Sequence, residues 1–333
     1  MERRIKKVLR IGDLEKTKYG DVRFAYRTAR MRINWLLHGY PTHLMVETNR
    51  RCNLQCSYCA ASQLLASGKL KPVEMGDDLY RYILSETSRV IGESISVLGV
   101  GGLQEPLLDS KLIDRIDLAR AYFPRAAITI TTNATLLTPE IGKQLINRLD
   151  GMCISLNSFD KAVYQCLNNK DAYEATARNI STFLDMKAGR KPFTEIQLLN
   201  VESNKPYVQG FLDYYGKWAG SNIKLKLHDL HSWAGNLADY DQRPMPSRRP
   251  CVQLWDYLWF SAEGDAYPCC LGEVAHDLCF GNIRDGVSSL LASRKLAEMR
   301  LRHLYNEYTG SCQCCQVWRE KVAPMIRVGK RWL

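Results

Sequence analysis

Three cysteines near the start of this 333-residue chain are spaced so that they could ligate a metal cluster. Cys52, Cys56 and Cys59 have C-x3-C-x2-C spacing, so one short loop can place three thiolates around a common centre. A [4Fe-4S] cluster is normally held by four thiolates, and three leave one iron open to an outside ligand. A random chain with 12 Cys would show this spacing only about 0.015 times. The alternative is a zinc knuckle or a buried thiol cluster, although a closed zinc site requires a fourth Cys or His.

The sequence around these cysteines resembles the signature of the radical S-adenosylmethionine (SAM) enzymes. That signature is CxxxCxxC with an aromatic residue, here Tyr58, just before the third cysteine. The resemblance implies that the open iron binds the amino and carboxylate groups of SAM, and that reduction releases a 5′-deoxyadenosyl radical. The cofactor supplies this chemistry, while the protein supplies position and exclusion of water. The resemblance also implies an external electron donor such as flavodoxin or ferredoxin.

The elements that must position these residues alternate between apolar, β-branched runs and helical patterns. Strands are expected at 42–47, 95–100, 127–132, 151–156, 195–201 and 223–228. Helices are expected at 25–37, 77–91, 111–122, 139–149, 160–187 with a break near Lys170, and 205–218. This alternation predicts an α/β fold in which helices cover a parallel sheet. Six strands are too few for a closed eight-stranded barrel, so we expect a (β/α)6 partial TIM barrel at residues 41–240, after a basic extension at 1–40.

Functional residues of such barrels lie at the carboxyl ends of the strands. The second strand leads into Gly101-Gly102-Leu103-Gln104-Glu105-Pro106, where glycines let the backbone approach a ligand and a carboxylate could bind the SAM ammonium. This stretch departs from the compact GGEP of the family, and a plain turn is the alternative. By resemblance, Asn133 after the third strand contacts SAM and Ser155 in the fourth binds its ribose or carboxylate. The alternatives are a loop cap for Asn133 and a buried hydroxyl for Ser155.

A second cysteine-rich region follows a proline-containing stretch at 243–250 that is typical of a linker. Its pattern of cysteines around Gly264, with a final C-x2-C, resembles the SPASM/Twitch extension. The resemblance implies one auxiliary [4Fe-4S] cluster in a small C-terminal β-hairpin/helix domain at 241–333, held by Cys251, Cys269, Cys312 and Cys315. Position 321 is Lys where the full SPASM pattern has a further Cys, which favours the shorter Twitch form. Cys270 or Cys314 could replace a neighbouring ligand, and a zinc ribbon is the alternative.

Composition and charge narrow the function classes. Twelve Cys in 333 residues are too sparse for a disulfide-stapled secreted scaffold. Neither a secretory signal nor a run of about 20 apolar residues is found, so we expect a cytoplasmic protein without a membrane span. The formal net charge of +11 permits an anionic, phosphorylated or nucleotide-linked small-molecule substrate. We find no basic-aromatic pattern of a nucleic-acid module.

The candidates for the chemical step are few. His228 and His231 follow the sixth strand and could act as a base or bind substrate. Our first hypothesis is a radical SAM oxidoreductase acting on a sugar, aminocyclitol or nucleotide-like compound, with the auxiliary cluster accepting an electron; the resemblance is closest to Twitch-type dehydrogenases. The second is an epimerase in which Cys153 or Cys279 returns a hydrogen atom. Modification of a ribosomal peptide is a third, and an iron-sulfur electron carrier or a zinc-stabilised binding protein is the non-enzyme alternative.

Overall fold

The computed structural model describes residues 40–218, 220, 222–237, 251–304 and 307–317, with short strands at 327–328 and 331–332. The expected helix at 25–37 and the expected linker at 243–250 lie outside these ranges. Within the described ranges, nine strands form one sheet in the order β6-β5-β4-β3-β2-β1-β7-β8-β9, and β10 (Arg327–Val328) pairs with β11 (Arg331–Trp332).

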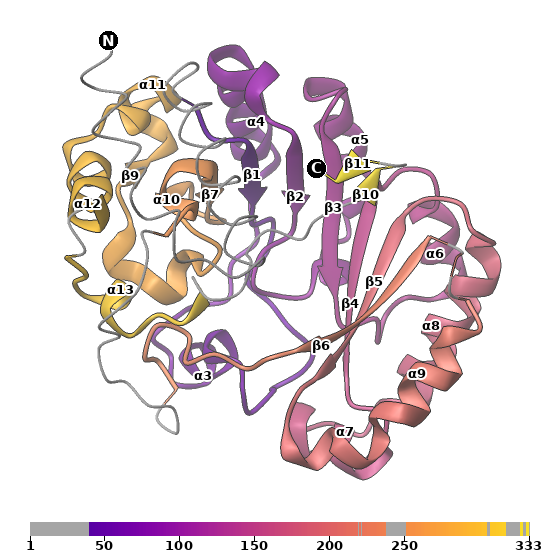
Figure 1. Ribbon diagram of the computed structural model, residues 1–333. Helices are drawn as coiled ribbons and strands as arrows, with labels where there is room; N and C mark the ends of the chain where they lie inside the picture. The colour runs from indigo at the N-terminus through magenta and orange to yellow at the C-terminus, as the bar shows by residue number, and fades with distance from the viewer. Residues whose placement is uncertain are drawn as a thin grey trace, which may run out of the picture.

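The first six strands of this sheet are parallel and form the expected partial barrel (Figure 1). They are β1 (His43–Val46), β2 (Val97–Val100), β3 (Ala127–Thr132), β4 (Gly151–Asn157), β5 (Phe193–Leu199) and β6 (Ile223–His228). The sheet does not close, because β6 forms its edge in the described part of the chain. Strand β5 begins and ends two residues earlier than expected, since Phe193 pairs with Gly151 at the start of β4.

Helices connect the strands, and all of them except α3 (Ala60–Ala66) cover one side of the sheet. The others are α4 (Asp77–Ile91), α5 (Leu112–Tyr122), α6 (Pro139–Leu145), α7 (Lys161–Asn168), α8 (Tyr173–Lys187) and α9 (Val208–Gly216). The expected break in 160–187 falls at Asn169, whose left-handed backbone (φ +53°) ends α7. Helix α6 stops four residues before the expected end, because Ile146 is extended. Helix α9 starts only after a 3-10 segment (Glu202–Tyr207) that contains Pro206, which lacks the amide proton a helix interior needs.

Alternation along the strands separates an apolar face from a polar one. Isoleucines and leucines such as Ile130, Ile154 and Leu198 are buried in the main core on the helix side. Successive side chains of a strand point to opposite faces. The opposite face, called the inner face below, therefore carries Thr131, Cys153, Ser155, Glu195, Gln197, Lys224, Lys226 and His228.

The C-terminal region continues the barrel sheet. Strand β7 (Tyr257–Phe260) pairs in parallel with β1, and β8 (Asp265–Tyr267) and β9 (Gly281–Asn282) follow it in antiparallel order. The expected hairpin is therefore present and is joined edge to edge to the barrel (Figure 1). Around it lie α10 (Gln253–Asp256), α11 (Val287–Leu291), α12 (Arg294–Leu304) and α13 (Ser311–Cys314). None of the helices in the described ranges is long and apolar enough to cross a bilayer.

Candidate active site

The cysteine loop leaves the carboxyl end of β1 and ends at α3. All three of its cysteines are half-buried, and Cys59 is the N-cap residue of α3. Burial raises the pKa of Cys52 to about 11 and that of Cys56 to about 12, and the neighbouring thiols add to both shifts. The three thiols therefore lie close enough to repel one another as thiolates. Bound metal would relieve this repulsion, because positive charge stabilises thiolates.

The C-terminal end of α7 holds one side of the loop. The side-chain oxygen of Asn168 accepts hydrogen bonds from the Tyr58 hydroxyl (2.8 Å) and the Cys56 thiol (3.2 Å). The Asn168 carbonyl also accepts the backbone amide of Gln55 at 3.3 Å. Asn168 is fully buried, and it was not among the residues expected at the site. The signal for it was weak: an amide side chain on the last turn of an amphipathic helix.

The end of β3 holds the other side of the loop. The Asn133 side-chain amide donates to Asn53 at 2.9 Å and lies 3.9 Å from the Cys52 sulfur. Its side-chain oxygen accepts the backbone amide of Thr135 at 3.0 Å. Asn133 therefore caps its own turn and also contacts the cysteine loop, and its contact with SAM stays a prediction.

Glu105 connects the ends of β2 and β3. Its carboxylate is 2% exposed and accepts hydrogen bonds from the Thr132 hydroxyl (2.7 Å) and from the backbone amides of Asn133 (2.7 Å) and Leu107 (3.0 Å). Burial raises the pKa of Glu105 to about 7, against the effect of these donors. Protein donors thus already occupy both carboxylate oxygens, and a contact with the SAM ammonium stays a prediction.

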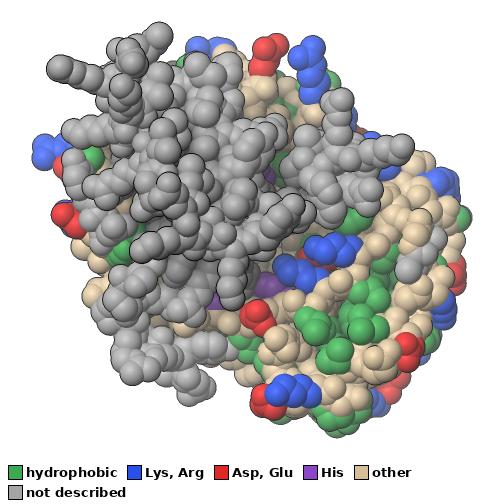
Figure 2. Space-filling model, in the orientation of Figure 1, with side chains coloured by type: hydrophobic (Ala, Val, Ile, Leu, Met, Phe, Trp, Pro, Cys, Tyr) green, Lys and Arg blue, Asp and Glu red, His purple; other side chains and the backbone are tan. Residues whose placement is uncertain are grey.

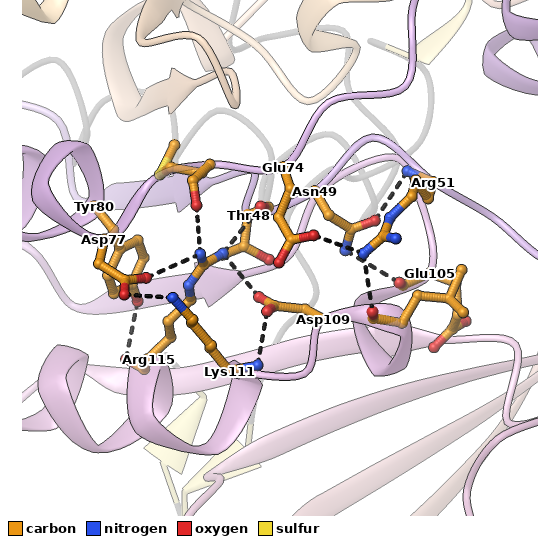
Figure 3. Close-up of polar contacts among 12 residues, drawn as sticks. Thr48, Asn49, Arg51, Glu74, Asp77, Tyr80, Glu105, Asp109, Lys111 and Arg115 are labelled. Atoms are coloured by element: carbon orange, nitrogen blue, oxygen red, sulfur yellow. Dashed lines mark hydrogen bonds and ion pairs between the residues drawn. The ribbon is translucent and has the colours of Figure 1, made fainter.

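A buried arginine of α5 fixes the start of the cysteine loop (Figure 3). The Arg115 guanidinium donates to the Asp109 carboxylate at 2.8 Å and to the Thr48 carbonyl at 2.9 Å. The next residue, Asn49, donates through its side chain to the Glu105 carbonyl at 3.2 Å. The loops that follow β1 and β2 are therefore tied together before the first cysteine.

Gly102 is required by packing. A Cβ atom there would lie 2.7 Å from Cγ of Glu47, the buried residue that follows β1. Gly101 has φ +128°, a backbone conformation that side chains rarely adopt. The fold therefore requires glycine at both positions, whether or not SAM is bound. Their expected approach to SAM stays a prediction.

The four cysteines expected at the auxiliary cluster line one cavity. The cavity is lined by Cys251, Cys269, Cys312 and Cys315 and by apolar residues that include Leu254, Leu271, Leu278 and Val317. Cys270 and Cys314 are not among the described residues that line it. No three His, Cys, Asp or Glu side chains in the described ranges are gathered for a single metal ion. Four thiols around one apolar cavity fit a [4Fe-4S] cluster, which spreads its ligands over four irons.

Trp233 lies between the two cysteine sets. Its indole nitrogen donates to the Tyr58 carbonyl at 2.8 Å, and its ring packs in one cluster with Cys59 and in another with Cys269. Its backbone is left-handed (φ +50°), which is uncommon for a bulky residue. This segment therefore joins the cysteine loop to the auxiliary region.

The candidates for the chemical step separate into two places. Cys153, Ser155 and His228 share the inner face, and His231 lies close by, with its ring centroid 6.5 Å from that of His228. Burial lowers the pKa of His231 to about 4 and lowers that of His228. Cys279 precedes β9, at the far end of the sheet, and its thiol is 3.5 Å from the Gly281 carbonyl. The structure therefore does not bring Cys279 together with Cys153.

Comparison with known proteins gives two family matches. The radical SAM superfamily matches residues 46–196, and the iron-sulfur cluster-binding SPASM domain matches residues 251–316. The chain is 26% identical over 312 residues to the GTP 3′,8-cyclase of Mycolicibacterium smegmatis, covering 84% of this chain and 81% of that protein. It is 27% identical over 228 residues to GTP 3′,8-cyclase 2 of Mycobacterium tuberculosis, covering 63% of this chain and 58% of that protein.

Solved structures show the same fold. BtrN in complex with AdoMet and 2-DOIA has a TM-score of 0.57 at 18% identity, covering 83% of this chain and 93% of that one. SuiB of Streptococcus suis bound to the precursor peptide SuiA has a TM-score of 0.62 at 13% identity, covering 92% of this chain and 76% of that one. The two family matches contain the two cysteine sets described above, one set each. The chain therefore belongs to the radical SAM enzymes, with a SAM-binding [4Fe-4S] cluster and a C-terminal SPASM-type iron-sulfur domain.

Proposed function

We propose that this radical SAM enzyme is an oxidoreductase that dehydrogenates a small polar substrate, such as a sugar, an aminocyclitol or a nucleotide-like compound. The observation that carries the proposal is the cavity lined by Cys251, Cys269, Cys312 and Cys315. Four protein ligands close an auxiliary cluster to substrate, which suits electron transfer better than substrate ligation. When bound, SAM would supply a 5′-deoxyadenosyl radical that takes a hydrogen atom, and the auxiliary cluster would take one electron.

The inner face supplies the groups that would bind the substrate and move its proton. Burial and the charge of Lys226 lower the pKa of His228, so its imidazole is neutral at neutral pH. A neutral imidazole can accept the hydroxyl proton when an alcohol carbon loses its hydrogen atom and one electron. The products then balance as a carbonyl compound, 5′-deoxyadenosine, a protonated imidazole and one electron passed to the auxiliary cluster. Ser155 and Gln197 are paired in register on the same face and can orient the substrate by hydrogen bonds.

A second candidate is radical cyclisation of a nucleotide. It is favoured by the similarity to a protein named GTP 3′,8-cyclase over 84% of this chain. An epimerase is a third candidate, because the Cys153 thiol lies on the inner face where a hydrogen donor would be needed. We propose the same cofactor ligands for all three, with flavodoxin or ferredoxin as the electron donor in the cytoplasm.

One experiment separates these candidates. The protein is reconstituted anaerobically, its iron and sulfide are counted, and it is reduced with SAM and a metabolite panel that includes GTP. We expect about eight irons per chain, and a substrate that raises 5′-deoxyadenosine release and loses two hydrogens. A product of unchanged mass that carries solvent deuterium on carbon would indicate epimerisation instead. Conversion of GTP to an isomer without carbon-bound deuterium would indicate cyclisation. A reduced holoenzyme that releases no 5′-deoxyadenosine would refute all three.

A further inference from the structure

The edge strand β6 presents a row of basic side chains on the inner face. Lys224, Lys226 and His228 alternate along the strand and therefore point to one side of the sheet. In register, Lys224 lies opposite Glu195 and Lys226 lies opposite Gln197. Figure 2 shows Lys or Arg side chains gathered with His side chains in a hollow near the centre of the view, over the strands at this edge.

Both lysines form an ion pair with Glu195, the acidic residue of this row, but only Lys224 is hydrogen-bonded to it. The ammonium of Lys224 lies 2.5 Å from the Glu195 carboxylate, and the Gln197 amide donates to the same carboxylate at 2.7 Å. The ammonium of Lys226 lies 3.7 Å from Glu195, beyond hydrogen-bonding distance. Its three N–H groups have no acceptor among the residues that the structure describes, and its side chain keeps 36% exposure.

His228 adds a second polar group with unused hydrogen-bonding capacity in the part of the chain that the structure describes. Its Nδ1 atom is buried and makes no hydrogen bond to any residue in the described ranges. Buried polar atoms of native proteins are rarely left in this state, because the lost hydration costs free energy. The neighbouring carboxylate of Asp229 accepts a hydrogen bond from the Asn200 side chain at 2.6 Å instead. Lys226 has an ion pair but no hydrogen-bond acceptor in the described ranges, and the Nδ1 atom of His228 has no hydrogen bond there. The two side chains therefore offer adjacent groups with unused hydrogen-bonding capacity.

We propose that Lys226 and His228 form an oxyanion subsite that binds a phosphate or carboxylate group of the substrate. The ammonium offers three donors and a full charge, and one imidazole N–H adds a directed hydrogen bond. A cationic group would not be held here, because the Glu195 carboxylate already binds Lys224 and Gln197. This inference rests on the proposed function in one respect, namely that the inner face is the substrate chamber.

The test measures binding without turnover. The reconstituted holoenzyme is saturated with SAM, so that added anions do not reach the open iron, and is titrated anaerobically with pyrophosphate and with malonate. The variants are Lys226→Met, Lys226→Arg and His228→Leu. Lys205→Met is the matched control, because Lys205 is an exposed lysine paired only at the surface with Glu202. Urea midpoints of all variants show that each is folded.

We expect the wild type to bind at least one of the two anions and Lys226→Met to bind it at least about tenfold more weakly, as loss of a charge-assisted hydrogen bond requires. Lys226→Arg should restore binding, His228→Leu should weaken it, and the control should match the wild type. Stronger binding of pyrophosphate indicates a phosphorylated substrate, and stronger binding of malonate a carboxylate. The proposal is overturned if the wild type binds neither anion at millimolar concentration, or if Lys226→Met and His228→Leu bind as tightly as the wild type. Absence of SAM cleavage would refute the proposed function without changing this binding result.

Discussion

Arg50 is a buried cation that joins the cysteine loop to the auxiliary region, and its removal tests how strongly the two are coupled. Its side chain is 4% exposed, and its guanidinium contacts Glu47 (3.6 Å), Glu263 (3.1 Å) and Glu273. The side chains of Glu47 and Glu273 are 1% and 7% exposed. An Arg50→Met substitution therefore leaves two buried carboxylates beside each other without a cation.

Removing one partner of a buried ion pair costs about 3–5 kcal/mol, and we expect Arg50→Met to lose this much free energy of unfolding. Adding Glu47→Gln should recover part of the loss, because only one of the two buried carboxylates then stays charged. Burial raises the pKa of both Glu47 and Glu273, and Arg50 acts against that rise. A carboxyl with a raised folded-state pKa contributes stability below its unfolded pKa and loses it as the pH rises. The deficit of Arg50→Met should therefore shrink as the pH falls toward about 5.

The assay is anaerobic urea unfolding of the reconstituted protein near neutral pH and near pH 5. Arg89→Met is the control, because Arg89 is 68% exposed and pairs with Glu86 at the surface of α4. Its loss should stay below about 1 kcal/mol, as is typical of exposed pairs. The reasoning fails if Arg50→Met also loses less than about 1 kcal/mol, or if its deficit is the same at both pH values.

Three further predictions concern the two cysteine sites. Asn168→Leu should destabilise the protein by about 1–3 kcal/mol and lower its iron content, because the half-buried Tyr58 hydroxyl loses its acceptor and α7 no longer holds the cysteine loop; unchanged iron would contradict this. Cys315→Ser should leave about four irons per chain. Cys166→Ser, at an exposed cysteine, is the control and should keep the wild-type iron count. The same iron count in both variants would show that Cys315 is not a ligand. Gly102→Ala should cost about 1–3 kcal/mol in urea unfolding through its clash with the Glu47 side chain. Gly216→Ala, inside α9 and with no atom within 4 Å, should cost nothing; similar losses would contradict the packing argument.

Local features of the sequence predicted most of the architecture. The strands and helices of the barrel could be predicted from the sequence because each buries one face, and burial requires a regular alternation of apolar residues. The first metal site could be predicted for a similar reason, because one short loop supplies the thiols of Cys52, Cys56 and Cys59. The predicted ends of helices and strands were wrong where a single residue adopts a different backbone conformation, as the extended Ile146 does after α6.

Tertiary structure decided which distant residues meet. Asn168 reaches the cysteine loop across more than a hundred residues, and Arg50 reaches carboxylates more than two hundred residues away. The cavity of the auxiliary cysteines forms only when the segments around Cys251, Cys269 and Cys312 pack together. The sequence by itself determined the periodic burial and the chemistry of each short motif, because both depend on near neighbours in the chain. Contacts between motifs depend on how the strands order themselves in the sheet, and no local pattern records that order.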